Sequence, residues 1–264
     1  VATMGATAEL VGVLGREDVD SRVLRAFPKG VKRSGIVRVK NYRTPVKTRI
    51  LAGGLHSARQ QIVRIDREGS VPNEVEIRSM VERSALGACP ECDAVLVSDY
   101  GSGLITPSLV TSVRRSLAKR GRRLRIPILV DSRHQLLRYR GLTACTPNES
   151  EAENMLGRQI GDNSRRLERA GREILKRTRS EGVVLTRGSL GMSVFVPGQR
   201  TAHLPIYGTD EIADVTGAGD TVIAVISLAL ASGASLYEAA RLATYAGGLV
   251  VMKRGTATVS GDEL

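Results

Sequence analysis

From about residue 93 onward, the sequence repeats one pattern: a short apolar run, a polar or glycine-rich turn, and then a helical stretch. Repeated strand–turn–helix units predict a mostly parallel β-sheet covered by helices. Open parallel sheets bind ligands beyond the carboxyl ends of their strands. The pattern therefore predicts an α/β fold with a functional site along one sheet edge. The apolar runs are residues 94–97, 126–130, 142–145 and 183–185.

Two segments have the periodicity of amphipathic helices. Residues 163–181 place Leu167 and Ile174 on one face and many arginines and lysines elsewhere. This is typical of a helix with a solvated basic face and, alternatively, of a membrane-surface helix. Residues 236–252 carry small residues such as Ala243 at helical spacing, which predicts close packing against another helix or the sheet.

Residues 31–67 have a different periodicity. Apolar and polar side chains alternate in three runs, at residues 36–40, 48–51 and 61–66. Period-two alternation predicts strands with one solvent-facing side, and Gly53 and Gly54 predict a turn between the last two strands. We therefore expect a small β lid over residues 31–67 and a main α/β core made of residues 1–30 and 68–264.

The composition of the 264 residues limits the classes of function. The formal net charge is +12, but the basic residues are scattered and do not interleave with aromatic residues, so we expect no nucleic-acid-binding surface. The longest apolar stretch, residues 222–231, is about half of a membrane span, so we expect no association with a membrane. Trp is absent, and Val, Leu, Ile and Ala must fill the core, as they do in buried parallel sheets.

The three cysteines are Cys89, Cys92 and Cys145. The first two match C-x-x-C, the spacing of a redox pair or of half a zinc site, but no second pair exists and histidines are few. We expect reduced thiols at the entry to a buried strand. Few cysteines and no signal peptide predict a cytoplasmic protein.

The strongest local signal is Asp-Val-Thr-Gly-Ala-Gly-Asp at residues 214–220, which precedes an apolar helical pattern. Gly217 and Gly219 allow the backbone to approach a ligand closely. Free amides at the start of the helix then form an anion site. Asp220, in the first turn, is either a group that reacts with substrate or a simple stabiliser of the helix.

Two strand ends carry further candidate residues. Asn148 and Glu151, in Thr-Pro-Asn-Glu-Ser-Glu, supply oxygen atoms of the kind that Mg²⁺ prefers. The same spacing fits a helix capping box, and both roles are compatible. Thr186 and Gly188 follow the next apolar run, where Thr-x-Gly is also typical of an ordinary hairpin turn.

Together, the 214–220 and 148–151 motifs resemble those of the ribokinase (PfkB-type) carbohydrate kinases. The resemblance implies an α/β, ribokinase-like three-layer sandwich around a mostly parallel sheet, with a small β lid, and phosphoryl transfer from ATP to a sugar. It makes Asp220 the catalytic base and assigns phosphoryl stabilisation to Gly217, Ala218 and Gly219. It assigns Mg²⁺ to Asn148 and Glu151. The residues it assigns to ATP binding are Asn148, Glu149, Ser150, Glu151, Thr186, Gly188, Thr216 and Thr256.

Other segments resemble the heptose 7-phosphate kinase branch of that family, at residues 46–50, 60–66, 97–103, 130–133, 146–151 and 255–260. Members of that branch make heptose 1,7-bisphosphate for the lipopolysaccharide core. The resemblance thus implies a sugar phosphate as substrate, a homodimer, and K⁺ as a further candidate cofactor. The implied substrate-binding residues are Asp99, Lys47, Arg49, Arg64 and Asp214.

Two departures from the branch leave alternatives open. Asp131, Ser132 and Arg133 stand where the branch has Asp-Pro-Lys, and arginine does not reproduce the geometry of a lysine ammonium. Val1 matches a point well inside a typical member, beyond its acidic sugar-binding strand. The alternatives are another ribokinase-like kinase, acting on a fructose phosphate, ribose or a nucleoside, and a non-catalytic nucleotide-binding module.

Overall fold

The structure is a computed structural model of residues 1–264 that describes residues 1–52, 60–67, 69, 74–119, 125–208 and 214–264. The chain forms two compact units. Val1–Ala8 and Leu86–Leu264 make up unit 1, and Glu9–Ala85 make up unit 2. Unit 2 extends beyond the expected lid, residues 31–67, because the first strand of that segment pairs with a strand that precedes it. The function of residues 31–67 as a lid stays a prediction.

Unit 1 contains a six-stranded sheet of strand order β10-β9-β8-β7-β6-β5. Neighbouring strands from β5 to β8 run parallel, and β9 and β10 are antiparallel to their neighbours. The mostly parallel sheet predicted from the sequence is thus confirmed. The strands are β5 (Val95–Asp99), β6 (Ile128–Ser132), β7 (Ala144–Cys145), β8 (Gly182–Thr186), β9 (Met192–Phe195) and β10 (Ala202–Leu204).

Helices cover both faces of this sheet. Because side chains alternate along a strand, Val130 packs toward one helical layer, and the adjacent Leu129 packs toward the other. The first layer contains α3 (Pro107–Ala118), α4 (Glu149–Leu156) and α5 (Ser164–Thr178). The second contains α6 (Ala218–Ala231) and α7 (Leu236–Val251). Unit 1 is therefore a three-layer α/β sandwich.

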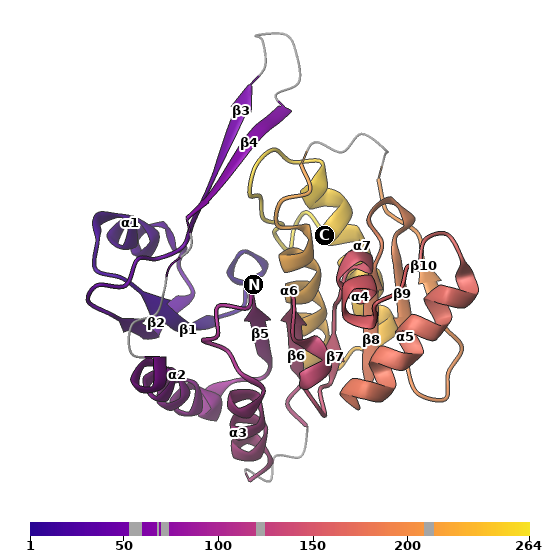
Figure 1. Ribbon diagram of the computed structural model, residues 1–264, viewed down its shortest axis with the longest axis horizontal. Coiled ribbons are helices and arrows are strands. Elements are labelled where there is room, and N and C mark those ends of the chain that lie inside the picture. The colour runs from indigo at the N-terminus through magenta and orange to yellow at the C-terminus, as the bar shows by residue number, and fades with distance from the viewer. Residues whose placement is uncertain (53–59, 68, 70–73, 120–124, 209–213) are drawn as a thin grey trace. The chain divides into compact units, whose positions relative to one another are not determined.

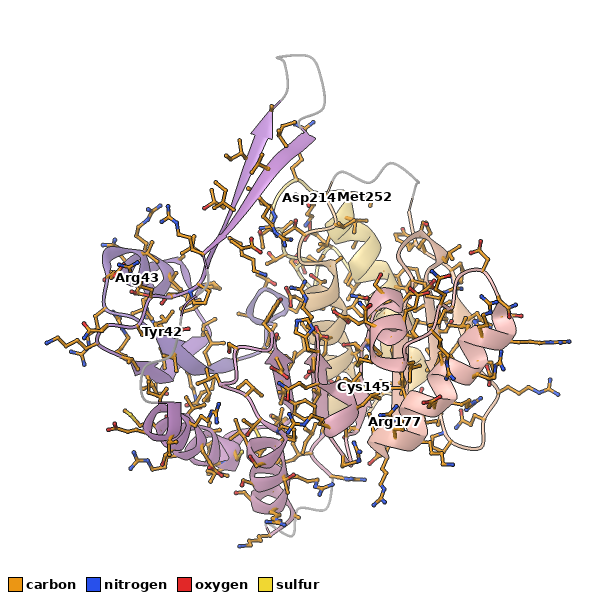
Figure 2. All side chains as sticks on the ribbon, in the orientation of Figure 1. Tyr42, Arg43, Cys145, Arg177, Asp214 and Met252 are labelled. Carbon is orange, nitrogen blue, oxygen red and sulfur yellow. The ribbon has the colours of Figure 1, made fainter. Side chains whose placement is uncertain are left out.

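The two helices expected from periodicity are confirmed. In α5, Leu167 and Ile174 are buried and Arg177 is exposed. Figure 2 shows Arg177 on this helix and Cys145 in the interior, on the neighbouring sheet. The alanines Ala239, Ala243 and Ala246 of α7 are fully buried in the layer that α7 shares with α6. Close helix packing of this kind requires small side chains.

Unit 2 contains two separate two-stranded sheets. One pairs β1 (Ala8–Leu14) with β2 (Val31–Arg38), and α1 (Asp18–Ala26) connects them. The other is a hairpin of β3 (Val46–Ala52) and β4 (Gln60–Arg67), which Figure 1 shows extending away from the rest of unit 2. The turn expected at Gly53 and Gly54 lies outside the described residues. Most of α2 (Glu74–Ala88) also belongs to unit 2. Unit 1 contains the short helices η1 (Ala2–Met4), η2 (Cys89–Glu91), η3 (Leu136–Arg138) and η4 (Gly188–Leu190).

Candidate functional site

The parallel register brings the polar strand ends of unit 1 to one edge of the sheet. Ser98 lies opposite Asp131 at the ends of β5 and β6. Beyond β7, Asn148 forms a parallel bridge with Thr186. The sequence prediction that these strand ends share one edge is therefore confirmed.

Asn148 and Glu151 form a complete capping box at the start of α4. The Asn148 side-chain oxygen accepts from the Glu151 amide at 2.8 Å, and the Asn148 amide donates to the Glu151 carboxylate at 3.0 Å. The expected capping role is confirmed, while the expected role toward Mg²⁺ stays a prediction. Each side chain retains acceptor capacity, because a carboxylate or an amide oxygen can accept more than one bond.

Glu149 is bound to the end of β8. Its carboxylate accepts from Arg187 Nε at 2.6 Å, and Arg187 also donates to the Gly161 carbonyl at 2.9 Å. The Glu149 side chain thus contributes to joining α4 to the β8 end. Ser150, next along the first turn of α4, is exposed.

Thr186 and Gly188 lie in the tight connection between the antiparallel strands β8 and β9. The Arg187 amide donates to the Gly191 carbonyl at 2.8 Å, which closes the turn. Gly188 has φ 55°, which glycine adopts at little cost. The ordinary hairpin reading of Thr-x-Gly is confirmed, and nucleotide binding by Thr186 and Gly188 stays a prediction.

Helix α6 begins where the Gly-Ala-Gly motif predicts. Gly217 precedes it in the left-handed conformation, with φ 83°, and within the described part of the chain no side chain caps the helix. The Ala218 amide donates to the Val215 carbonyl at 3.2 Å, so one of the three expected anion-binding amides is already bonded. Asp220 lies in the first turn and is exposed.

Asp214 organises the loop that leads into α6. Its carboxylate accepts from the Thr216 amide at 2.8 Å and from the Gly255 amide at 3.2 Å. The Asp214 amide donates to the Val251 carbonyl, and Figure 2 shows Asp214 next to Met252. These bonds tie the loop to the segment after α7.

Thr256 follows Gly255 in that segment. A methyl group on Gly217 would lie 3.9 Å from Thr256 Cγ2, so Thr256 is close to the start of α6. The substrate role expected of Asp214 and the nucleotide role expected of Thr216 and Thr256 stay predictions.

Tyr100 contacts the expected catalytic base. Its hydroxyl donates to Asp220 Oδ1 at 3.3 Å, and the Arg133 guanidinium carbon lies 5.8 Å from the centre of its ring. Within the 97–103 segment, the sequence predicts a site role for Asp99 and not for Tyr100. No local pattern shows that Tyr100 reaches a residue 120 positions away.

Asp99 is buried, and its carboxylate is held by hydrogen bonds. Its carboxylate accepts from Ser132 Oγ at 2.8 Å, from the Tyr139 hydroxyl at 2.8 Å and from the Gly101 amide at 2.9 Å. It is 3% exposed. This geometry gives Asp99 a structural role at the end of β5, and the sugar-binding role expected from the sequence stays a prediction.

Asp131 is a candidate site residue that the sequence reasoning did not select. Burial raises the pKa of its carboxyl group to about 7, the charges of Glu151, Asp220 and Asp99 add to the rise, and Arg133 opposes it. Asp131 thus lies in an acidic region shared with the ends of α4 and α6. The signal that could have found it is strand register, since Asp131 lies opposite Ser98 of β5, one residue before the end of β6.

Thr146 carries an unpartnered polar group beside Asp131. In the parallel register, Asp131 and Thr146 each follow the Val130–Cys145 pair by one position. The Thr146 hydroxyl is buried and has no hydrogen-bond partner among the described residues. Buried hydroxyls without a partner are uncommon and often mark the position of a water or an ion.

The residues at this edge suit a divalent cation. Among the described residues, no three His, Cys, Asp or Glu side chains are already gathered as a metal site. Mg²⁺, however, is usually bound through one or two carboxylates together with water and substrate phosphate. Asp131 and Glu151, with the amide oxygen of Asn148, fit that need.

The expected substrate-binding residues Lys47, Arg49 and Arg64 lie on the hairpin of unit 2. Arg49 is directly opposite Arg64, and Lys47 is opposite Asp66. Arg64 also forms an ion pair with Asp66 at 3.0 Å. Like charges placed directly opposite repel each other, so this face of the hairpin suits an anionic ligand.

Two further expectations from the sequence concern the cysteines and the apolar segments. Cys89 and Cys145 are buried, and Cys92 Sγ donates to the Cys89 carbonyl at 3.2 Å. Within the described part of the chain, no helix is both long and apolar enough to cross a membrane.

The model of the pfkB family of carbohydrate kinases matches residues 1–262. Bifunctional protein HldE of Geobacter sulfurreducens is 39% identical over 268 residues, which cover 100% of this chain and 52% of that protein. HldE of Aeromonas hydrophila is 38% identical over 267 residues, with the same coverage of 100% and 52%. The chain thus spans about half the length of the curated relatives it matches.

Solved structures share the fold. Phosphofructokinase-2 from Escherichia coli in complex with potassium has a TM-score of 0.78 at 20% identity. The match covers 99% of this chain and 81% of the phosphofructokinase chain. Arabidopsis thaliana ribokinase complexed with ribose and ATP has a TM-score of 0.70 at 21% identity. That match covers 100% of this chain and 80% of the ribokinase chain. The ribokinase-like fold predicted from the sequence is confirmed.

Proposed function

Because the chain belongs to the pfkB family of carbohydrate kinases, we propose that it transfers the γ-phosphoryl group of ATP to a sugar hydroxyl. The observation that carries this proposal is the uncapped start of α6 with Asp220 in its first turn. Phosphoryl transfer asks chiefly for positioning and for stabilisation of negative charge. An uncapped helix start supplies that stabilisation beside a carboxylate.

In the proposed reaction, Asp220 accepts the proton of the acceptor hydroxyl. The sugar oxygen forms a bond to the γ-phosphorus, the bond from that phosphorus to the β–γ bridging oxygen breaks, and ADP leaves. The Gly219 amide and the dipole of α6 stabilise charge on the transferring group. The Ala218 amide joins them if it releases Val215.

The nucleotide side of the site is assigned to α4 and the β8–β9 turn. Asn148 and Glu151 would hold Mg²⁺ together with Asp131, and Thr186, Gly188, Thr216 and Thr256 would contact ATP. When bound, Mg²⁺ neutralises charge on the phosphates. Potassium is a further candidate, supported by the phosphofructokinase-2 complex with that ion.

The best-supported acceptor is heptose 7-phosphate, phosphorylated at its anomeric hydroxyl. Support comes from the resemblance to the heptose branch and from HldE relatives at 36–39% identity. A substrate that is itself a phosphate ester gives Lys47, Arg49 and Arg64 a function, since cations bind phosphate through charge-assisted hydrogen bonds.

A homodimer formed through the hairpin is part of the proposal. Ile50 and Ile65 are exposed on β3 and β4. Their cross-strand partners are Val63 and Thr48, which places all four on the face opposite Arg49 and Arg64. An exposed apolar strand face is a surface that a second copy can cover. Light scattering of the wild type and of Ile50→Lys tests this, and a monomeric wild type contradicts it.

Substrate choice is tested with a coupled assay of ADP release on a panel of heptose 7-phosphate, fructose 6-phosphate, ribose and nucleosides. Turnover with heptose 7-phosphate supports the proposed acceptor, and turnover only with another sugar overturns it. Calorimetry that detects ATP binding, with no turnover of any sugar, supports a nucleotide-binding module instead.

The base is tested with Asp220→Asn and, as the matched control, Asp262→Asn near the C-terminus. Loss of the general base is expected to lower kcat by about a thousandfold or more, while the control keeps wild-type turnover. An Asp220→Asn protein with normal turnover would remove Asp220 from the mechanism.

A further inference from the structure

Tyr100 is held in place by the end of β5. The preceding residue, Asp99, is buried and receives hydrogen bonds from Ser132 and Tyr139. The following residue, Gly101, donates its amide back to Asp99 and has φ 81°. A side chain on Gly101 would also approach the His134 ring to 2.8 Å, so this turn suits glycine alone. The backbone on both sides of Tyr100 is thus fixed.

The ring of Tyr100 is also restrained from one face. The Arg133 guanidinium carbon lies 5.8 Å from the ring centre, within the range of a cation–π contact. The Arg133 amide donates to the Asp99 carbonyl at 3.1 Å. Arg133 and Tyr100 are therefore positioned by the same residue, even though Tyr100 is 54% exposed.

The hydroxyl of Tyr100 is hydrogen-bonded to one oxygen of the Asp220 carboxylate. It donates to Oδ1 at 3.3 Å. Burial, followed by the charge of Asp220, raises the pKa of Tyr100, so the phenol remains a proton donor at neutral pH. A carboxylate whose one oxygen is held in this way presents the other in a defined direction.

We propose that Tyr100 is a positioning residue for Asp220: its hydroxyl holds Oδ1 so that Oδ2 faces the acceptor hydroxyl. The inference rests on the proposed function. It also gives Arg133 a role as the support of the Tyr100 ring, which a lysine at that position would fill less well, because a planar guanidinium stacks on an aromatic face.

The direct test is Tyr100→Phe, which removes the hydroxyl and keeps the ring. Losing a hydrogen bond to a charged group is expected to lower kcat about tenfold, with the KM for ATP and for the sugar within about twofold of wild type. Tyr237→Phe, on an exposed tyrosine of α7, is the matched control and should match the wild type.

A double-mutant cycle separates positioning from a general structural effect. If Tyr100 acts through Asp220, Tyr100→Phe adds no further loss in an Asp220→Asn background. A full tenfold loss in that background, or an unchanged kcat for Tyr100→Phe alone, overturns the proposal.

A crystal structure of Tyr100→Phe tests the same claim without turnover. The expected result is an Asp220 carboxylate that occupies more than one rotamer, compared with one in the wild type. A single, unchanged rotamer in the variant contradicts the proposal. If the wild type phosphorylates no sugar, the proposed function fails, and this comparison still decides the role of Tyr100.

Discussion

Arg187 Nε donates to the Glu149 carboxylate at 2.6 Å, and the two side chains are 12% and 23% exposed. The pair joins the β8–β9 turn to the first turn of α4. These are the two elements to which ATP binding is assigned, and the bridge between Asn148 and Thr186 lies beside them. Because the pair is largely shielded from water, removing one partner costs more than it does at the surface, since the other charge is left buried and uncompensated.

Arg187→Met is expected to raise the KM for Mg·ATP about tenfold or more, because it leaves Glu149 without its partner and loosens α4 against β8. The KM for the sugar should change little. Steady-state kinetics with each substrate varied in turn measures the difference.

Arg177→Met provides the control for that prediction. Arg177 pairs with Glu173 at 3.4 Å on the exposed face of α5, and pairs of this kind contribute about 0.3–0.5 kcal/mol. Arg177→Met should therefore leave both KM values unchanged. Equal effects of the two substitutions, or a change confined to the sugar KM, would contradict the role given to Arg187.

Asp214→Ala is expected to loosen the loop that precedes α6. It removes the acceptor of the Thr216 and Gly255 amides, which should lower the free energy of unfolding by about 1–3 kcal/mol. We also expect kcat to fall, since Gly217 would lose its fixed position. Urea denaturation and the coupled assay, with Asp262→Ala as control, measure both effects. A variant with wild-type stability would show that these bonds contribute nothing.

Local sequence patterns predicted the strand ends because a polar turn after an apolar run is visible in any short window. The observed β6 (Ile128–Ser132) and β7 (Ala144–Cys145) begin later than the apolar runs at 126–130 and 142–145. The two antiparallel strands β9 and β10 were not predicted. The pairing of β9 with β8 depends on a fold-back at residues 187–191, which the alternation of apolar and polar residues does not encode.

The direction of each carboxylate could not be predicted in the same way. Asp99 and Asp131 both follow apolar runs, and the sequence alone gives no means of telling their directions apart. In the parallel register, Asp99 pairs with Ser132 rather than with Asp131, so the two aspartates lie on opposite faces of the sheet. One becomes a structural anchor, and the other faces the charges of Glu151 and Asp220.

Asp131 predicts a specific dependence of stability on pH. Its pKa is about 7 in the folded chain, compared with an ordinary value of 3.8. Between these values the folded chain holds a proton that the unfolded chain releases, so the free energy of unfolding falls as pH rises from about 4 to about 7. Asp131→Asn removes this contribution.

The expected result is that Asp131→Asn is more stable than the wild type at about pH 8, by roughly 1–3 kcal/mol, and similar to it at about pH 4. Urea denaturation at both pH values, without divalent cations, measures the difference. The same variant should bind Mg·ATP more weakly. If the free energy of unfolding depends on pH identically in wild type and variant, the surroundings of Asp131 do not disfavour its charged form.

Two helical glycines predict opposite effects of the same substitution. Gly171, in α5, faces the Phe195 ring, and an added methyl group would overlap the ring. Gly87, in α2, has open space around it, with nothing within 4 Å of an added methyl group. Replacing glycine by alanine within a helix stabilises the folded state by about 0.5–1 kcal/mol when there is room, whereas overpacking costs about 1–3 kcal/mol.

Gly171→Ala should therefore lower the free energy of unfolding and Gly87→Ala should raise it, as measured by urea denaturation. A stabilised Gly171→Ala protein would show that α5 can move away from β9, and it would contradict the close packing of that layer.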